Sequence, residues 1–162
     1  MAATIEMQAC TSTDAGTEAT AAAITFRAND SADNNSDNPI TIPGSGTTYS
    51  YEKWLRWKCT AAPDTQCTNF KFWGPNSTPG TGLVIYAGTT DTGVTPTDSD
   101  SSVATTRQDT NYYDSSNTLS IAGTLTTIGN ETDYLVLQLD VGDTATQGDM
   151  TQQTMYYSYD EN

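Results

Sequence analysis

The chain contains no histidine, and it has only six basic residues against twenty acidic ones. Without histidine, Ser-His and Cys-His nucleophiles and histidine-ligated metal centres are excluded, because each needs an imidazole. The formal net charge of -14 repels phosphate backbones and anionic lipid surfaces over a Debye length of roughly 8 Å. We therefore expect neither nucleic acid nor a membrane as a partner.

Long apolar runs and an amino-terminal export signal are also missing. No run approaches the roughly 18 apolar residues of a membrane-spanning helix. Residues 1–25 lack a basic segment and carry Glu6, Asp14 and Glu18 where a signal peptide would be apolar. The sequence therefore predicts a protein made in the cytoplasm without Sec-type targeting.

Cysteine is scarce, with three residues in the chain: Cys10, Cys59 and Cys67. An odd number leaves at least one thiol unpaired, and a cytoplasmic origin keeps thiols reduced. Strand parity also argues against a Cys59–Cys67 disulfide, because Cys67 would share a face with Lys71, opposite the phenylalanines of the same strand. A β-bulge would be needed to bring the two sulfurs together.

Threonine is the commonest residue, and serine, glycine, asparagine and aspartate are abundant, which favours strands and turns over helices. The clearest strand lies at 133–141, where Leu135, Leu137 and Leu139 alternate with Tyr134 and other residues. We expect this strand to occupy the centre of a sheet and to bury one face. At 162 residues the chain fits one domain that buries roughly 70% of its unfolded surface.

Further strands are expected at 4–9, 22–27, 49–60, 69–73, 83–87, 119–121 and 155–159, with a short edge segment at 40–42 and the pair Leu125 and Ile128 beyond 121. The segments 49–60 and 69–73 are predicted to pair as a hairpin. The region 88–117 is weakly patterned and is expected to be loop-rich. About eight strands without strand–helix alternation predict an all-β fold, an antiparallel β-sandwich of jelly-roll or immunoglobulin-like type, over a single domain 1–162.

Carboxylates offer the remaining chemistry. Glycoside hydrolysis needs two carboxylates and no histidine, but acids more often sit on solvated faces. Asp33, Asn35 and Asp37 have the first ligand spacings of an EF-hand, yet Asn38 replaces the required glycine and Gly44 the closing glutamate. Asp98 and Asp100 form a second acidic pair; for both loops, asparagine- and aspartate-rich turns are the expected structure. We predict no enzymatic activity, no catalytic residue, no metal and no cofactor.

Four of the six bases fall between Lys53 and Lys71. If strands 49–60 and 68–73 pair, five aromatic and basic residues share the face opposite the core: Trp54, Arg56, Lys58, Lys71 and Trp73. Tryptophan and arginine dominate binding hot spots, so this face is a candidate partner-binding patch. Alternatively, it is the second buried face of a central strand, whose bases reach solvent at the rim.

Three parts of the chain carry a resemblance: NPITIP at 38–43 leading to GTTYSYEKWL at 46–55; TNFKF at 68–72; and YLVLQL at 134–139 followed by MYYSYDE at 155–161. Together they resemble virion structural proteins of tailed double-stranded DNA bacteriophages. Small acidic β-sandwiches of this kind are most often capsid decoration, or cement, proteins.

The resemblance implies a subunit on the outer capsid surface of the virion, made in the bacterial host cytoplasm. Its partner would be the major capsid protein, with other copies of itself as a second possibility. Repeated copies on a symmetric lattice add modest contacts by avidity. A neck, tail or head-fibre component is the first alternative, and a carbohydrate-binding module the second, motivated by aromatics and by Asp/Asn-rich loops.

Overall fold

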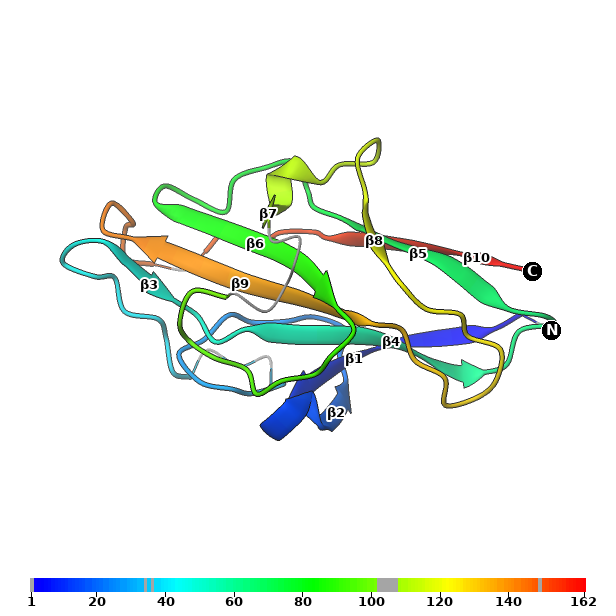
Figure 1. The fold of residues 1–162 in the computed structure, drawn as a ribbon. Helices are drawn as coiled ribbons and strands as arrows, with labels where there is room; N and C mark the ends of the chain where they lie inside the picture. Colours follow the sequence, from blue (N-terminus) through cyan, green and yellow to red (C-terminus); the bar gives the residue numbers. More distant parts are fainter. Residues whose placement is uncertain (1, 34, 36, 102–107, 149) are drawn as a thin grey trace.

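Two antiparallel β-sheets pack face to face in the computed structural model, which describes residues 2–33, 35, 37–101, 108–148 and 150–162. The amino and carboxyl termini lie at the same end of the molecule (Figure 1). Helical structure within these residues is limited to the 3-10 turns η1 (Thr13–Ala15) and η2 (Thr110–Tyr112). The predicted all-β sandwich is therefore confirmed. No helix in this part of the chain is long and apolar enough to cross a membrane.

The large sheet has the strand order β2 (Thr17–Thr20), β1 (Thr4–Thr11), β4 (Lys53–Ala61), β9 (Tyr134–Gly142), β6 (Leu83–Thr90) and β7 (Gln108–Asp109), and β3 (Thr47–Tyr49) pairs with the far end of β9. The small sheet has the order β10 (Tyr156–Glu161), β5 (Cys67–Trp73) and β8 (Leu119–Ile121). All strand pairs in both sheets are antiparallel.

Strand β9 is central, as its alternation predicted: it pairs with β4, β6 and β3. Leu135 and Leu137 face the small sheet and join the main core. The prediction of a single buried face was wrong, because Tyr134 and Val136 on the opposite face are also buried. Burial removes their apolar surface from water, and another part of the chain, including Val94, packs against them.

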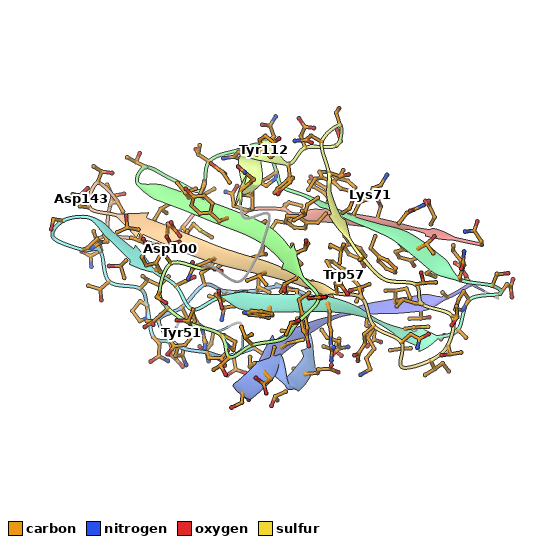
Figure 2. All side chains as sticks on the ribbon, in the orientation of Figure 1. Tyr51, Trp57, Lys71, Asp100, Tyr112 and Asp143 are labelled. Atoms are coloured by element: carbon orange, nitrogen blue, oxygen red, sulfur yellow. The ribbon has the colours of Figure 1, made fainter. Side chains whose placement is uncertain are left out.

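The main core lies between the sheets and is made of aromatic and aliphatic side chains. Trp57 of β4 belongs to the same core cluster as Phe70 and Phe72 of β5, and all three are almost fully buried. Trp57 lies between the two sheets in Figure 2. Burying a large side chain of this kind contributes roughly 1.5–3 kcal/mol. This core fixes which face of the small sheet points outward.

The large sheet is wider than the small one, so a second apolar cluster is covered by irregular segments. Ile85, Leu139 and Val141 form this cluster. Phe26, Ile40 and Ile42 from one connection, together with Ala145, Met150 and Met155 from another, pack against it. Residues 22–27 are therefore not the strand that the sequence predicted, although Ile24 and Phe26 do pack against apolar clusters.

The predicted strand 49–60 is divided. β3 ends at Tyr49 and β4 begins at Lys53, because the amides between them bond to three different segments. Ser50 donates to the carbonyl of Leu139, Tyr51 to that of Arg27, and Glu52 to that of Thr97, each at 2.9 Å.

The predicted hairpin between 49–60 and 69–73 was also wrong. β4 pairs with β1 and β9, whereas β5 pairs with β10 and β8 in the other sheet. The connection at 62–66 therefore crosses from sheet to sheet rather than turning within one. In the region 88–117, the described residues include the end of β6, β7 and η2; residues 102–107 lie outside the description.

Candidate docking surface

The outward face of the small sheet carries Lys71, Trp73, Ser120, Tyr156 and Ser158, and we call these five residues the docking face. Cross-strand partners point to the same side of a sheet. Trp73 is paired with Tyr156, and Lys71 with both Ser158 and Ser120. Alternation along β5 sends Phe70 and Phe72 inward and leaves Lys71 exposed.

An aromatic stack is the main feature of the docking face. The rings of Trp73 and Tyr156 lie 5.6 Å apart between centroids at an angle of 13°. Tyr156 is 46% exposed, although its ring is large and apolar. Lys71, labelled beside the small sheet in Figure 2, is exposed and lies two positions before Trp73 on the same face of β5. The face thus combines a flat aromatic surface with a positive charge on a protein of net charge -14.

The five residues predicted as one patch do not form one. Lys71 and Trp73 lie on the small sheet, whereas Trp54, Arg56 and Lys58 lie on the outer face of the large sheet. The prediction failed because it rested on pairing between β4 and β5, which belong to different sheets. Tyr156, which completes the aromatic stack, was not among the predicted residues. Only the strand register between β5 and β10 brings it beside Trp73.

Arg56 and Lys58 are engaged within the protein. Glu18 of β2 and Glu131 each accept from both bases, and together they form a four-membered charge network. Lys58 Nζ lies 2.7 Å from a carboxylate oxygen of each glutamate, and Arg56 Nη1 lies 2.8 Å from Glu131. Two positive and two negative charges cancel locally. The network therefore ties the edge strand β2 to β4 and to the segment before β9.

Trp54 is buried rather than displayed. Its side chain is 1% exposed, and its Nε1 donates to Oε2 of Glu52 at 2.9 Å. Its ring packs edge-on against Tyr134 with centroids 5.2 Å apart, and the Arg56 guanidinium lies 5.1 Å from the centre of the same tyrosine ring. The alternative reading of this face, a second buried face with bases at its rim, is the one that fits these contacts.

The segment 91–101 covers this outer face of the large sheet. Thr97 donates its amide to Oε2 of Glu52, and Ser101 donates its amide to Oε1 of Gln138 at 3.0 Å. The Gln138 side-chain amide donates in turn to the carbonyls of Ser50 and Ser99. Glu52 and Gln138 are both 1% exposed, so their polar groups hold the segment in place from below. The outer face of the large sheet is therefore covered, whereas no described segment covers the outer face of the small sheet.

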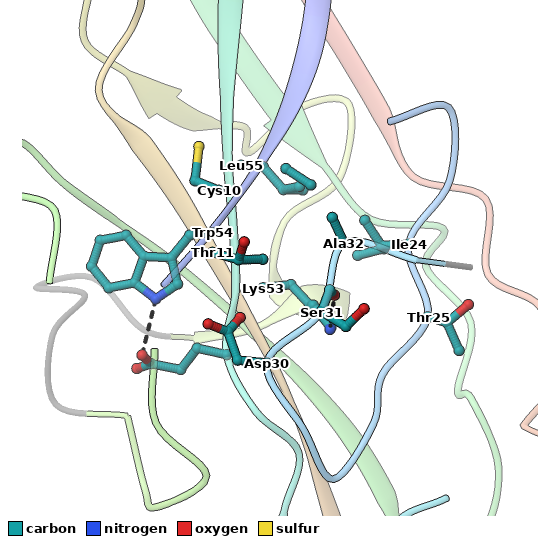
Figure 3. A pocket seen from close by; sticks show the side chains of 12 residues that line it. Cys10, Thr11, Ile24, Thr25, Asp30, Ser31, Ala32, Lys53, Trp54 and Leu55 are labelled. Carbon is teal, nitrogen blue, oxygen red and sulfur yellow. Dashed lines mark hydrogen bonds between the residues drawn. The ribbon is translucent and has the colours of Figure 1, made fainter. Parts of the chain in front are cut away.

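Lys53 is a buried cation beside this covered face. It is 6% exposed, and its Nζ donates to the carbonyl of Ser31 at 2.8 Å. Burial lowers the pKa of the Lys53 amine from 10.5 to about 8, against the opposing effect of Asp30. A cavity of about 10 Å³, lined by Lys53, Asp30 and Glu52 among others, lies next to it (Figure 3). That volume matches a single water molecule.

All three cysteines are buried as free thiols. Burial raises the pKa of Cys10 to about 11 and also raises the pKa values of Cys59 and Cys67. The parity argument for Cys67 was wrong, because the β5–β10 register shifts next to Asn69, which has a φ of 56°. This bulge turns Cys67 inward, into the same core cluster as Cys59.

The acidic loops predicted as weak calcium candidates form local turns. Asn35 Oδ1 accepts from the amide of Asp37 at 3.0 Å, and the Ser31 hydroxyl accepts from the amide of Asp33 at 3.1 Å. Across the described ranges, no group of three or more cysteine, aspartate or glutamate side chains is placed to hold a metal ion. Asp98 and Asp100 follow Thr97 in the covering segment.

The structure is an all-β sandwich in which, within the described ranges, one outer face is covered and the other is not. Comparisons with protein-family models, with curated proteins and with solved structures each found no match.

Proposed function

We propose that this chain is a non-enzymatic structural protein of a tailed-phage virion, most specifically a capsid decoration protein that binds the outer head surface. In this proposal the docking face contacts major capsid subunits and braces their junctions. The virion assignment rests on the resemblance of the segments at 38–55, 68–72, 134–139 and 155–161. The mode of action, binding rather than catalysis, rests on the geometry of the docking face.

The observation that carries the proposal is the aromatic stack on the docking face, in which Tyr156 is 46% exposed and lies against a partly buried Trp73. An exposed tyrosine ring beside a basic side chain, here Tyr156 beside Lys71, is typical of the residues that carry binding energy at an interface. Trp54, Arg56 and Lys58 are not part of the proposed surface, because their side chains already have partners within the chain.

The net charge of -14 supports the outward location. An acidic protein is repelled by packaged DNA, so it is better suited to the outside of a shell than to its inside. Weak contacts are sufficient on a symmetric shell that holds many identical copies. When neighbouring copies touch, one bound copy raises the effective concentration of binding contacts for the next.

The test adds purified protein to undecorated, expanded heads of the parent phage. We expect saturable binding at a symmetric stoichiometry and a higher temperature of head disruption. The double variant Trp73→Ala/Tyr156→Ala should bind at least tenfold more weakly, because truncated aromatic hot spots cost about 2 kcal/mol or more.

Tyr112→Ala is the matched control, because Tyr112 is 58% exposed but lies on η2, outside the docking face. It should bind like the wild type, and all variants should keep the wild-type circular dichroism spectrum. Heads that ignore the wild-type protein would refute the decoration role. A copy number near a dozen per virion, rather than hundreds, would indicate a neck or tail component instead of a decoration protein.

A further inference from the structure

Strand β10 has exposed tyrosines on both of its faces. Tyr156 points outward and is 46% exposed, and Tyr157 points toward the large sheet and is 45% exposed. Tyr157 contacts Trp57, with ring centroids 5.3 Å apart, so its inner face is packed while its remaining surface is open. A partner lying flat on the docking face would cover Tyr156 alone. A missing neighbouring strand explains both exposures, because side chains on either face of an edge strand lose their lateral neighbour.

The free edge of β10 is a template for another strand. β10 is the outermost strand of the small sheet and pairs only with β5 among the described residues. No further ladder bond along this edge is made by the described residues. At the end of the strand, the Ala3 amide donates to the Glu161 side chain, to Oε1 at 2.6 Å. Such an edge leaves a row of backbone donors and acceptors available for pairing.

Strand β10 carries few of the usual protections of an edge strand, because its two charges, Asp160 and Glu161, both lie at its carboxyl end. The strand is six residues long and contains neither proline nor lysine. The bulge in this part of the sheet has its extra residue on β5, since Asn69 and Phe70 together oppose Tyr159. β10 itself therefore remains regular. Natural proteins protect exposed edges by shortening, charging or bulging them, so a regular edge whose first four residues carry no charge is available for pairing.

We propose that the free edge of β10 binds an extended segment of a partner protein by antiparallel strand addition, and that this segment carries basic residues at its amino-terminal end. In antiparallel pairing that end lies beside Asp160 and Glu161. These two carboxylates accept only neutral donors, from Asn69 and Ala3, among the contacts described. A base on the added strand complements them, and alternate side chains of the strand cover Tyr156 and Tyr157.

A second copy of this chain fits the edge less well. In antiparallel self-pairing, the acids of each copy would lie opposite the tyrosines of the other, and β10 supplies no base to meet them. Two bodies of charge -14 would also be brought together. A basic heterologous strand has neither disadvantage. The identification of that strand with a capsid subunit rests on the proposed function, whereas the pairing itself does not.

The experiment uses the full chain and a short capped probe peptide in which lysines precede alternating threonine and valine. Site-resolved amide exchange measured by NMR reports on β10, and titration gives the affinity. Two matched peptides serve as controls: one has glutamate in place of lysine, and one is N-methylated at alternate residues so that its ladder bonds are blocked. The double variant Asp160→Asn/Glu161→Gln removes the charges while keeping side-chain oxygens for the Asn69 and Ala3 bonds.

We expect the lysine peptide to slow amide exchange in β10 and to bind roughly fivefold more tightly than the glutamate peptide. The N-methylated peptide should not bind. In the double variant the preference for lysine should fall below about twofold. Unchanged exchange in β10, or equal binding of the N-methylated peptide, would overturn the proposal.

A dimer of the free protein with β10 already protected would also overturn it, in favour of a second copy. Because the peptide experiment contains no heads, its failure is distinguishable from failure of the decoration role. Heads bound normally through Trp73 while β10 ignores every peptide would refute strand addition alone.

Discussion

Replacing Lys53 with methionine should change how stability depends on pH. Lys53 is 6% exposed, its amine donates to the Ser31 carbonyl, and its burial holds the pKa at about 8 rather than 10.5. Methionine keeps an unbranched chain of similar length but removes the titratable amine. The comparison therefore isolates the cost of burying a charged amine in this place.

The sign follows from proton binding. Between pH 8 and 10.5 the amine of the unfolded chain remains protonated while the folded amine has lost its proton, so raising the pH favours folding. Below pH 8 both states are protonated, and the cost of burying the charge is present in full. The difference between 10.5 and about 8 corresponds to roughly 3 kcal/mol. About 2 kcal/mol of this should be regained between about pH 7 and pH 10.

The assay is urea unfolding of the wild type and Lys53→Met at several pH values from 7 to 10. The buried cysteines, whose raised pKa values make folding less favourable as pH rises above 9.0, act equally in both proteins and cancel in the difference. Lys71→Met is the matched control, because Lys71 is exposed. We expect the stability of the wild type to rise relative to Lys53→Met by about 2 kcal/mol, and the control to show no such trend. A flat or falling difference would refute the buried-charge argument.

Three other perturbations test the packing. Asn130→Ala removes the Oδ1 acceptor that receives four hydrogen bonds from two consecutive threonines. In urea titration it should lower the free energy of unfolding by about 1–3 kcal/mol, whereas Asn130→Asp should retain most of the wild-type stability. The double variant Glu18→Gln/Glu131→Gln should lose more stability than the two single variants added together, because in each single variant the remaining carboxylate still partly neutralises the two bases. Additive losses of stability in this double-mutant cycle would contradict a coupled network. Gly93→Ala should lower the melting temperature by several degrees, because a Cβ at this position would collide with the Asp14 carbonyl. A melting curve unchanged from the wild type would contradict close packing of the segment 91–101 against Asp14.

Local alternation was enough to predict several elements of the fold. The strand at 133–141 has a period of two over its whole length, and it became the central strand β9. The sequence also indicated that the second face of this strand is buried, because Tyr134 and Val136 are apolar residues at outward positions. A strand with apolar residues on both sides is expected where both faces are covered.

Strand pairing could not be predicted in the same way. Whether β5 lies beside β4 or in the opposite sheet depends on contacts far apart in sequence, with β10 and β8. The bulge beside Asn69 is a local event, but asparagine tolerates a positive φ at many places where no bulge forms. The error on Cys67 and the error on the partner-binding patch both follow from these two limits.

The candidate surface was predicted in part. Lys71 and Trp73 were named from residue type, and both lie on the docking face, while Tyr156 required the β5–β10 register. Arg56 and Lys58, also named from residue type, pair within the protein with Glu18 and Glu131, which are distant in sequence. Sequence shows which side chains are suited to binding, and the tertiary fold decides which of them already have partners.

In the proposed function, the outer face of the small sheet holds the protein onto a larger protein shell. A reconstruction of the virion that carries this chain tests it most directly. We predict density for the sandwich at symmetric positions on the head, with Trp73 and Tyr156 turned toward the capsid subunits. Density with these two rings facing solvent, or a head with no copy of the protein, would contradict the account.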